Sequence, residues 1–387
     1  MYKIQTLNKI SPKGLDLLNH DTYEYASEIV HPDAILVRSF NMLDMEIPES
    51  VKAIARAGAG VNNIPVEKCS QRGIVVFNTP GANANGVKEL VIMALVLSSR
   101  KVYQAIQWAK GLKGKGDEVP ALIEKGKSNF DGSEIKGKKL GVIGLGAVGV
   151  IVANEALSMG MDVSGYDPYL SVDAAWQLSR QVKKAISLDS LLAESDYITF
   201  HVPLNDKTKG MLNREKFALV KKGLRIMNFA RGGLVNNEDL KKAIKDGIVA
   251  AYVTDFPDDD LLDIEQVIPI PHLGASTVES EENCAVMAVN QLREYLEFGN
   301  IKNSVNFPEC IMPPTEQRRI LIANKNVPNM IGQITPVLAE HNINIADMLN
   351  KSKGDYAYNI IDIDNGIGED AVEKLRRIQG VVMVRVI

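Results

Sequence analysis

The stretch Leu140–Gly149 reads Leu-Gly-Val-Ile-Gly-Leu-Gly-Ala-Val-Gly, in which an apolar run passes into the pattern Gly144, Gly146, Gly149. The apolar run is typical of a buried parallel strand, and residues 150–159 after it have the composition of a helix. Glycines at this spacing let the chain turn tightly, approach a pyrophosphate with its backbone, and pack the helix closely on the strand. The stretch therefore predicts a strand–turn–helix unit whose helix N-terminus faces the phosphates of a dinucleotide.

A second strand is expected over Asp162–Tyr166, and Asp167 follows it. An acidic residue about 20 residues beyond the first glycine accepts the hydroxyl groups of the adenosine ribose. Its charge also repels a 2′-phosphate, and residues 168–170 supply no arginine to hold one. The pattern therefore favours NAD over NADP as cofactor.

Strand and helix patterns alternate on both sides of this unit, which is typical of βαβ repeats around a parallel sheet. In the first hundred residues, strands are expected over 2–6, 34–38, 53–57 and 74–77. From Lys138 onward they are expected over 140–143, 162–166, 197–200, 225–228, 249–254 and 267–270. One long helix is predicted from Asn85 to about Leu112, a solvated connector over 110–127, and another long helix over 278–298.

The segment Asn306–Pro314 breaks regular structure, so a domain boundary is expected there. The residues after it predict the order β-α-β-β-α-β, which is that of a ferredoxin-like domain. The predicted fold class is α/β, with two Rossmann-like doubly wound domains and a C-terminal ferredoxin-like domain. The expected boundaries are 1–100 with 275–308 for a discontinuous substrate-binding domain, 101–274 for the NAD-binding domain, and 315–387 for the C-terminal domain.

Composition excludes several classes of protein. The 44 Lys and Arg residues against 48 Asp and Glu leave a net charge of −4, without the basic footprint of a nucleic-acid binder. The longest apolar run, Leu90–Leu97, is far shorter than the roughly 18 residues of a membrane span. Three scattered cysteines and five isolated histidines form no metal-binding motif. The N-terminus lacks the apolar core of a signal peptide, so a cytoplasmic protein without a metal is expected.

Two segments at predicted strand ends carry groups suited to hydride transfer from an alcohol. Arg231 follows one strand and precedes twin glycines, and His272 follows another strand. Such a reaction needs a cation to hold the reacting carbonyl compound and a group to move a proton. On spacing alone, a surface arginine and a core histidine explain these residues equally well.

The order of the motifs resembles the D-isomer-specific 2-hydroxyacid dehydrogenases. The glycine loop is followed by His201–Leu204 (HVPL), Ala230–Gly233 (ARGG) and Pro271–Thr277 (PHLGAST), and Arg56–Gly60 (RAGAG) with Asn78–Gly81 (NTPG) precede it. The resemblance implies an NAD-dependent enzyme that oxidises a phosphorylated 2-hydroxy acid, 3-phospho-D-glycerate, in serine biosynthesis. The alternatives are a dehydrogenase for glycerate, lactate or 2-hydroxyglutarate, and a non-enzymatic NAD-sensing regulator.

The resemblance also assigns roles to individual residues. It implies that Arg231 holds the substrate carboxylate and His272 carries the proton, with Asp259 as the acid paired with His272. Because the segment departs from the family pattern, Asp258 or Asp260 remain alternatives for that acid, and Asp255 lies one place later than the usual nicotinamide-side aspartate. The implied cofactor contacts are Gly144, Gly146, Ala147, Val148, Gly149, Asp167, His201, Val202, Pro203, Ala230, Asp255 and Gly274. The implied substrate contacts are Arg38, Arg56, Ala57, Gly58, Ala59, Gly60 and Asn78, with Arg38 and Arg56 as candidates for the substrate phosphate.

The C-terminal unit resembles an ACT domain, a module that senses amino acids. The effector positions fall on Asn324, Asn326 and Asn344, and L-serine is the ligand that the resemblance implies. The alternative is a module that only assembles subunits, because Asn324 and Asn329 depart from the usual residues. A homodimer or homotetramer is expected, with no nucleic acid and no membrane as partner.

Overall fold

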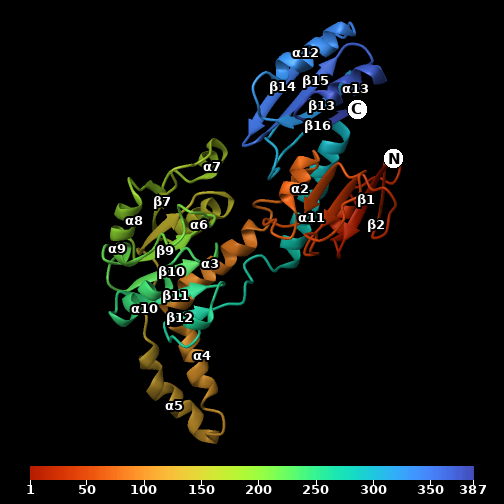
Figure 1. Ribbon diagram of the computed structural model, residues 1–387. Helices are drawn as coiled ribbons and strands as arrows, with labels where there is room; N and C mark the ends of the chain where they lie inside the picture. Colours follow the sequence, from red (N-terminus) through yellow and green to blue (C-terminus); the bar gives the residue numbers. More distant parts are fainter. The chain divides into compact units, whose positions relative to one another are not determined.

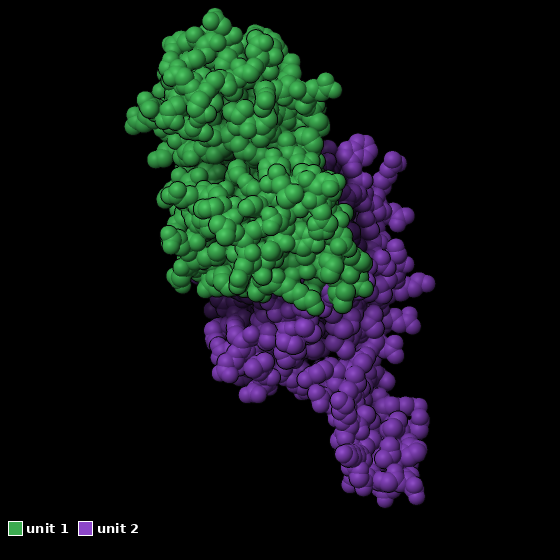
Figure 2. Space-filling view, turned by 90° about the vertical axis from the view of Figure 1, so that its right-hand side faces the viewer, with its two compact units in different colours: residues 1–83, 278–387 green, residues 84–277 purple.

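The computed structural model describes residues 1–387, which form two compact units. One unit contains residues 1–83 and 278–387, and the other contains residues 84–277 (Figures 1 and 2). The first holds a five-stranded and a four-stranded sheet, and the second holds a seven-stranded sheet. The predicted α/β class, with two parallel sheets and a small antiparallel C-terminal sheet, is confirmed. None of the helices has both the length and the apolar character needed to cross a membrane.

The five-stranded sheet is parallel throughout, in the order β2-β1-β3-β4-β5. Its strands are β1 Tyr2–Leu7, β2 Tyr23–Ala26, β3 Ala34–Val37, β4 Ala53–Arg56 and β5 Val75–Phe77, with helices α1 Pro12–Leu15 and α2 Val66–Gln71. Strand β2 was not among the predicted strands, although its alternating Tyr-Glu-Tyr pattern signals one. Helix α11 Val278–Phe298 packs on this sheet through buried residues such as Ala288 and Leu292.

The four-stranded sheet is antiparallel, in the order β14-β15-β13-β16. Its elements follow the chain as β13 Arg318–Lys325, α12 Met330–Glu340, β14 Ile345–Lys353, β15 Tyr356–Ile363, α13 Glu369–Arg377 and β16 Val381–Val386. The predicted β-α-β-β-α-β order is therefore correct. Isoleucines on one face, including Ile320 and Ile361, pack with the two helices, while Leu321 and Tyr358 on the other face join the core around α11.

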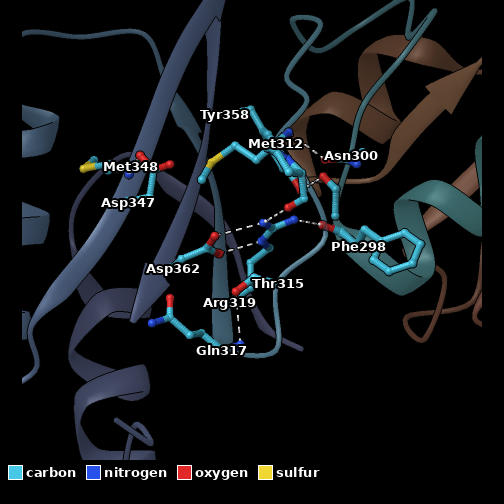
Figure 3. A network of polar contacts seen from close by, with 12 residues as sticks. Phe298, Asn300, Met312, Thr315, Gln317, Arg319, Asp347, Met348, Tyr358 and Asp362 are labelled. Carbon is cyan, nitrogen blue, oxygen red and sulfur yellow. Dashed lines mark hydrogen bonds and ion pairs between the residues drawn. The ribbon is translucent and has the colours of Figure 1, made fainter. Parts of the chain in front are cut away.

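A buried ion pair fixes the C-terminal sheet to the end of helix α11 (Figure 3). Arg319, 2% exposed, donates from Nε and Nη2 to the two carboxylate oxygens of Asp362 at 2.6 and 2.9 Å. The same guanidinium donates to the carbonyl oxygens of Phe298 at 2.8 Å and Pro313 at 2.7 Å. The guanidinium thus balances the buried charge of Asp362, and it supplies a donor to the Phe298 carbonyl, which has no partner within the helix.

The seven-stranded sheet is also parallel throughout, in the order β12-β11-β10-β9-β6-β7-β8. Its strands are β6 Lys139–Ile143, β7 Asp162–Tyr166, β8 Lys183–Lys184, β9 Tyr197–Phe200, β10 Leu224–Asn228, β11 Val249–Thr254 and β12 Val267–Pro269. The helices of the same α/β region are α6 Ala147–Ser158, α7 Val172–Gln177, α8 Leu188–Glu194, α9 Arg214–Phe217 and α10 Asn237–Lys245. Helix α3 Ala84–Ser99 shares the core of this unit through Val91 and Leu95. The unit therefore begins at Ala84, not at residue 101 as predicted.

The single helix predicted from Asn85 to about Leu112 is broken in the structure. Helix α3 ends at Ser99, Lys101 has a positive φ of 47°, and α4 Val102–Lys110 follows. The predicted connector over 110–127 also contains structure: the short helices η1 Gly116–Glu118, α5 Val119–Gly126 and η2 Lys127–Phe130. The Trp108 ring lies 5.4 Å from the ring of Phe130, so an aromatic contact between α4 and η2 supplies the packing that the local sequence did not signal.

Candidate active site

The glycine loop joins β6 to α6. Gly144 has φ of 91°, and a Cβ there would lie 2.6 Å from the carbonyl oxygen of His201. A Cβ on Gly149 would lie 1.9 Å from the carbonyl oxygen of Gly144, whereas one on Gly146 would meet nothing within 4 Å. The fold itself thus requires Gly144 and Gly149. Gly146 leaves open space beside the first turn of the twelve-residue helix α6, which fits the approach of a pyrophosphate.

Asp167 directly follows β7 and is held against this loop. Its Oδ2 accepts the N–H of Leu145 and its Oδ1 accepts the N–H of Tyr169, both at 2.8 Å. The side chain is half-buried, and each oxygen keeps a lone pair for a further donor. The structure therefore brings together the glycine loop and the carboxylate that the sequence pattern singled out.

The segment His201–Pro203 follows β9 and covers the glycine loop. The His201 N–H donates to the Ile143 carbonyl at 2.7 Å, and His201 Nε2 lies 3.0 Å from Thr199 Oγ1. Burial lowers the pKa of His201 to about 3, so its ring is neutral at physiological pH. A neutral, packed ring suits a role in shaping the loop and not one in carrying a proton.

Asn228, at the end of β10, shapes the turn that carries Arg231. Its Nδ2 donates to the Arg231 carbonyl at 2.9 Å, and its Oδ1 accepts the Ala230 N–H at 3.3 Å. Asn228 is 1% exposed and was not among the predicted site residues. The Arg231 guanidinium is exposed and donates to the Ala230 carbonyl at 2.6 Å. The turn thus presents a permanent cation at the carboxyl end of the sheet.

His272 lies on the loop after β12, tied to the end of β11. Its N–H donates to the Asp255 carbonyl at 3.1 Å, and the Gly274 N–H donates to Asp255 Oδ2 at 3.2 Å. The exposed imidazole ring lies 4.7 Å from the ring of Phe256. Since β10, β11 and β12 are neighbours in the sheet, their carboxyl ends carry Arg231, Asp255 and His272 in that order.

The Asp255 carboxylate is unusual among these groups. It is 2% exposed, and its Oδ1 is buried without a hydrogen-bond partner. Burial raises the pKa of this carboxyl above its ordinary value, and the Gly274 N–H and the charges of His272 and Arg231 oppose that shift. Two basic side chains of the site therefore influence one buried carboxylate.

The three aspartates proposed as partners for His272 lie elsewhere. Asp258 accepts a hydrogen bond from the Asn237 amide, and Asp260 pairs with Lys241 at 3.3 Å. Asp259 is exposed at the start of the short helix η3 Asp259–Leu261. No hydrogen bond or ion pair joins any of them to His272, so the structure does not form the predicted pair of Asp259 and His272.

The predicted substrate contacts gather at the carboxyl ends of β3, β4 and β5. Arg56 Nε donates to the Arg38 carbonyl at 2.9 Å, and a Cβ on Gly60 would lie 2.8 Å from Arg56 Nη1. The Asn78 amide donates to the Ala59 carbonyl at 2.6 Å. Arg38 also forms an ion pair with Glu281 of α11. Residues far apart in the chain thus form one basic cluster, as the motifs suggested.

The three predicted effector residues do not meet within one chain. Asn324 is 1% exposed, and its Oδ1 accepts from the Asn359 amide at 2.8 Å. Asn326 directly follows β13, whose last residue pairs with the first residue of β15. Asn344 directly precedes β14, whose first residue pairs with the last residue of β15. Asn326 donates to the Gly354 carbonyl at 3.0 Å, and Asn344 donates to Asp364. One small ligand therefore touches both Asn326 and Asn344 only if it bridges two copies of the chain.

Comparison with known proteins identifies the family and the fold of this chain. Residues 92–274 match the family model of the D-isomer specific 2-hydroxyacid dehydrogenase, NAD binding domain. The chain is 31% identical to a D-3-phosphoglycerate dehydrogenase of Haemophilus influenzae, over 96% of this chain and 90% of that protein. It is 33% identical to one of Methanocaldococcus jannaschii, over 84% of this chain and 61% of that protein. Against the latter and one of Archaeoglobus fulgidus, the chain spans between half and two thirds of the relative's length.

Solved structures with this fold include an NAD+-bound 3-phosphoglycerate dehydrogenase of Entamoeba histolytica. It is 27% identical, with a TM-score of 0.60 over 79% of this chain and 98% of that one. The D-mandelate dehydrogenase of Rhodotorula graminis has a TM-score of 0.68 at 19% identity, over 81% of this chain and 99% of that one. The second likeness shows the fold alone.

Proposed function

Because the chain belongs to the D-isomer specific 2-hydroxyacid dehydrogenase family, we propose that it oxidises 3-phospho-D-glycerate to 3-phosphohydroxypyruvate with NAD, the first step of L-serine biosynthesis. The near full-length match to the Haemophilus influenzae relative supports this substrate. The observation that carries the proposal is the row Arg231, Asp255 and His272 at the ends of β10, β11 and the β12 loop, in the sheet that also carries the glycine loop.

Residues 84–277 would hold the cofactor. The open space at Gly146 and the N-terminus of α6 suit the pyrophosphate, and Asp167 suits the ribose hydroxyls. A negative charge at that position opposes a 2′-phosphate, which supports NAD over NADP. When bound, NAD accepts the hydride from C2 of the substrate.

The chain's own residues supply the other half of the reaction. Arg231 binds the substrate carboxylate, and its positive charge stabilises the negative charge that develops on the C2 oxygen as its proton leaves. A ring nitrogen of His272 accepts the proton of the C2 hydroxyl as the C–H bond breaks. The protonated imidazole then needs a nearby carboxylate to stabilise it, a role that the family resemblance gave to Asp259.

The basic cluster of residues 1–83 would recognise the phosphorylated end of the substrate. The Arg56 guanidinium lies beside Gly58 and Gly60, and its Nε bonds to the backbone carbonyl of Arg38. Two arginines at neighbouring strand ends support binding of a dianion. Arg38→Gln should raise KM for 3-phosphoglycerate about tenfold or more, while leaving KM for D-glycerate nearly unchanged. Equal effects on both substrates would contradict phosphate recognition by Arg38 and favour an unphosphorylated 2-hydroxy acid. Lys13→Gln, which removes another exposed cation paired with α11, is the matched control.

We propose that residues 315–387 act as an ACT domain and regulate the enzyme within a homodimer or homotetramer. The placement of Asn326 and Asn344 at opposite ends of β15 supports an effector site shared by two copies. Calorimetric titration with L-serine, with and without NAD, tests it. Because linkage is reciprocal, an inhibitor that disfavours NAD binding must bind more weakly when NAD is present. No heat at millimolar serine would leave the domain as an assembly module.

A cytoplasmic location completes the proposal. Cys69, Cys284 and Cys310 are free thiols that are buried in the structure, which suits a reducing compartment. Fractionation of cells that express the tagged chain, followed by immunoblotting, checks the location.

A further inference from the structure

We propose that Asp255 positions His272 and stabilises its protonated ring, a role that falls to none of Asp258, Asp259 and Asp260. The inference rests on the proposed function, because His272 becomes protonated in the proposed oxidation of the substrate. It departs from the residue that the family pattern suggests, and it stands on contacts of this chain alone.

Asp255 holds the His272 loop at two points. Its backbone carbonyl accepts the His272 N–H at 3.1 Å, and its carboxylate accepts the Gly274 N–H at 3.2 Å. Asp255 therefore fixes the backbone of the loop at His272 and again at Gly274, on either side of Leu273. A loop fixed on both sides of the histidine loses less entropy when the ring takes up its working orientation.

The Asp255 carboxylate also lacks a hydrogen-bond donor at one of its oxygens. Its Oδ1 is fully buried without a hydrogen-bond partner, in a residue that is 2% exposed. A buried carboxylate oxygen without a partner is costly, and such groups concentrate where function requires them. The positively charged His272 imidazole would stabilise this carboxylate. It forms only after the ring has accepted the proton of the substrate hydroxyl.

The charged groups around Asp255 agree with that role. Arg231 follows β10 and His272 lies on the loop after β12, and the charge of each lowers the pKa of the Asp255 carboxyl against the effect of burial. From α3 the nearest contact at this point is apolar, since Val87 lies beside Gly274. Tyr252 on β11 bonds to Asn228, and the Asp258 carboxylate beyond it is held by Asn237. Asp255 thus contacts the His272 loop through both its backbone carbonyl and its carboxylate.

The test compares Asp255→Asn with Asp259→Asn, a neutralised aspartate four residues along the same segment. Asp255→Asn should lower kcat about tenfold or more and move the midpoint of the acidic limb of the pH profile to lower pH by about one unit, with KM for NAD within threefold of wild type. Asp259→Asn should change none of these quantities by more than threefold. The proposal is overturned if Asp259→Asn produces the shift, or if Asp255→Asn changes only KM for NAD, because Asp255 would then be a cofactor contact.

A second readout does not depend on the substrate. The ring protons of His272 can be followed by NMR across pH 4–9 in the cofactor-free protein, with His272→Gln to assign the signal among five histidines. Asp255→Asn should move the titration midpoint of that signal to lower pH, and Asp259→Asn should leave it in place. If wild type fails to oxidise phosphoglycerate but the midpoint still moves, the proposed function fails and this inference survives. If Asp255→Asn does not fold, any midpoint shift in the folded Asp259→Asn protein contradicts the inference.

Discussion

Asp167 and Asp255 directly follow two strands of one parallel sheet, β7 and β11, yet their surroundings differ. Asp167, after β7, is half-buried, and each of its oxygens accepts a backbone N–H at 2.8 Å. Asp255, after β11, is almost fully buried, with one N–H at 3.2 Å and one oxygen without a partner. A half-buried carboxylate whose two oxygens already accept hydrogen bonds suits a ligand that remains neutral, such as a ribose. A buried carboxylate that lacks a donor suits a charge that appears during a reaction.

The largest expected effect lies at the β12 loop, beside Asp255. His272→Gln removes the proposed proton acceptor, so kcat should fall by about 10²–10⁴-fold. NAD affinity, measured by fluorescence titration, should stay near the wild-type value because the glycine loop is untouched. A variant whose turnover remains within threefold of wild type would remove His272 from the mechanism.

A smaller effect is expected at the β7 end. Asp167→Ala removes a charged acceptor worth about 1.5–3 kcal/mol, so KM for NAD should rise roughly 10–100-fold and the preference for NAD over NADP should narrow. Asp162→Ala, an exposed aspartate at the other end of β7, is the matched control. Unchanged cofactor selectivity in Asp167→Ala would mean that another residue senses the ribose.

The glycine loop offers a way to separate folding from cofactor binding. A methyl group on Gly146 meets open space, so Gly146→Ala should keep the wild-type melting temperature within about 2 °C. It should nevertheless weaken NAD binding about tenfold, because the methyl group occupies the approach to the helix N-terminus. Gly144→Ala, which collides with the His201 carbonyl, should instead lower the melting temperature. Full NAD affinity in Gly146→Ala would move the pyrophosphate site away from this loop.

The smallest effect concerns stability and pH. Burial raises the pKa of Asp255 in the folded state, so this carboxyl favours folding at low pH and loses that contribution as pH rises through the folded value. Asparagine carries no such charge, so Asp255→Asn should melt about 1–3 °C above wild type near pH 8, with the gap closing towards pH 4. Thermal unfolding at a series of pH values checks this. A constant destabilisation at every pH would show that the carboxylate is structurally satisfied.

Local patterns carried enough information to predict the cofactor loop. The strand, the three glycines, the helix and Asp167 all lie within thirty residues of sequence, and each has a distinct physical signature. The basic cluster around Arg56 was likewise suggested by motifs at strand ends.

Features that depend on long-range packing could not be predicted in the same way. The Arg319–Asp362 pair joins residues 43 positions apart, and only the register of β13 and β15 brings them together. The break at Lys101, where φ is 47°, has no glycine or proline beside it that would signal the end of a helix. The acid beside His272 was assigned by counting along the segment, whereas burial singles out Asp255.

The most direct test of the whole account is the oxidation of NADH by the purified chain with 3-phosphohydroxypyruvate, followed at 340 nm, beside hydroxypyruvate and NADPH. We expect kcat/KM for the phosphorylated acid with NADH to exceed that for hydroxypyruvate by about tenfold or more, since the basic cluster contributes charge-assisted hydrogen bonds to the phosphate. Turnover with NADPH should be weaker than with NADH. Equal rates for the two acids, or no turnover of either, would contradict the account.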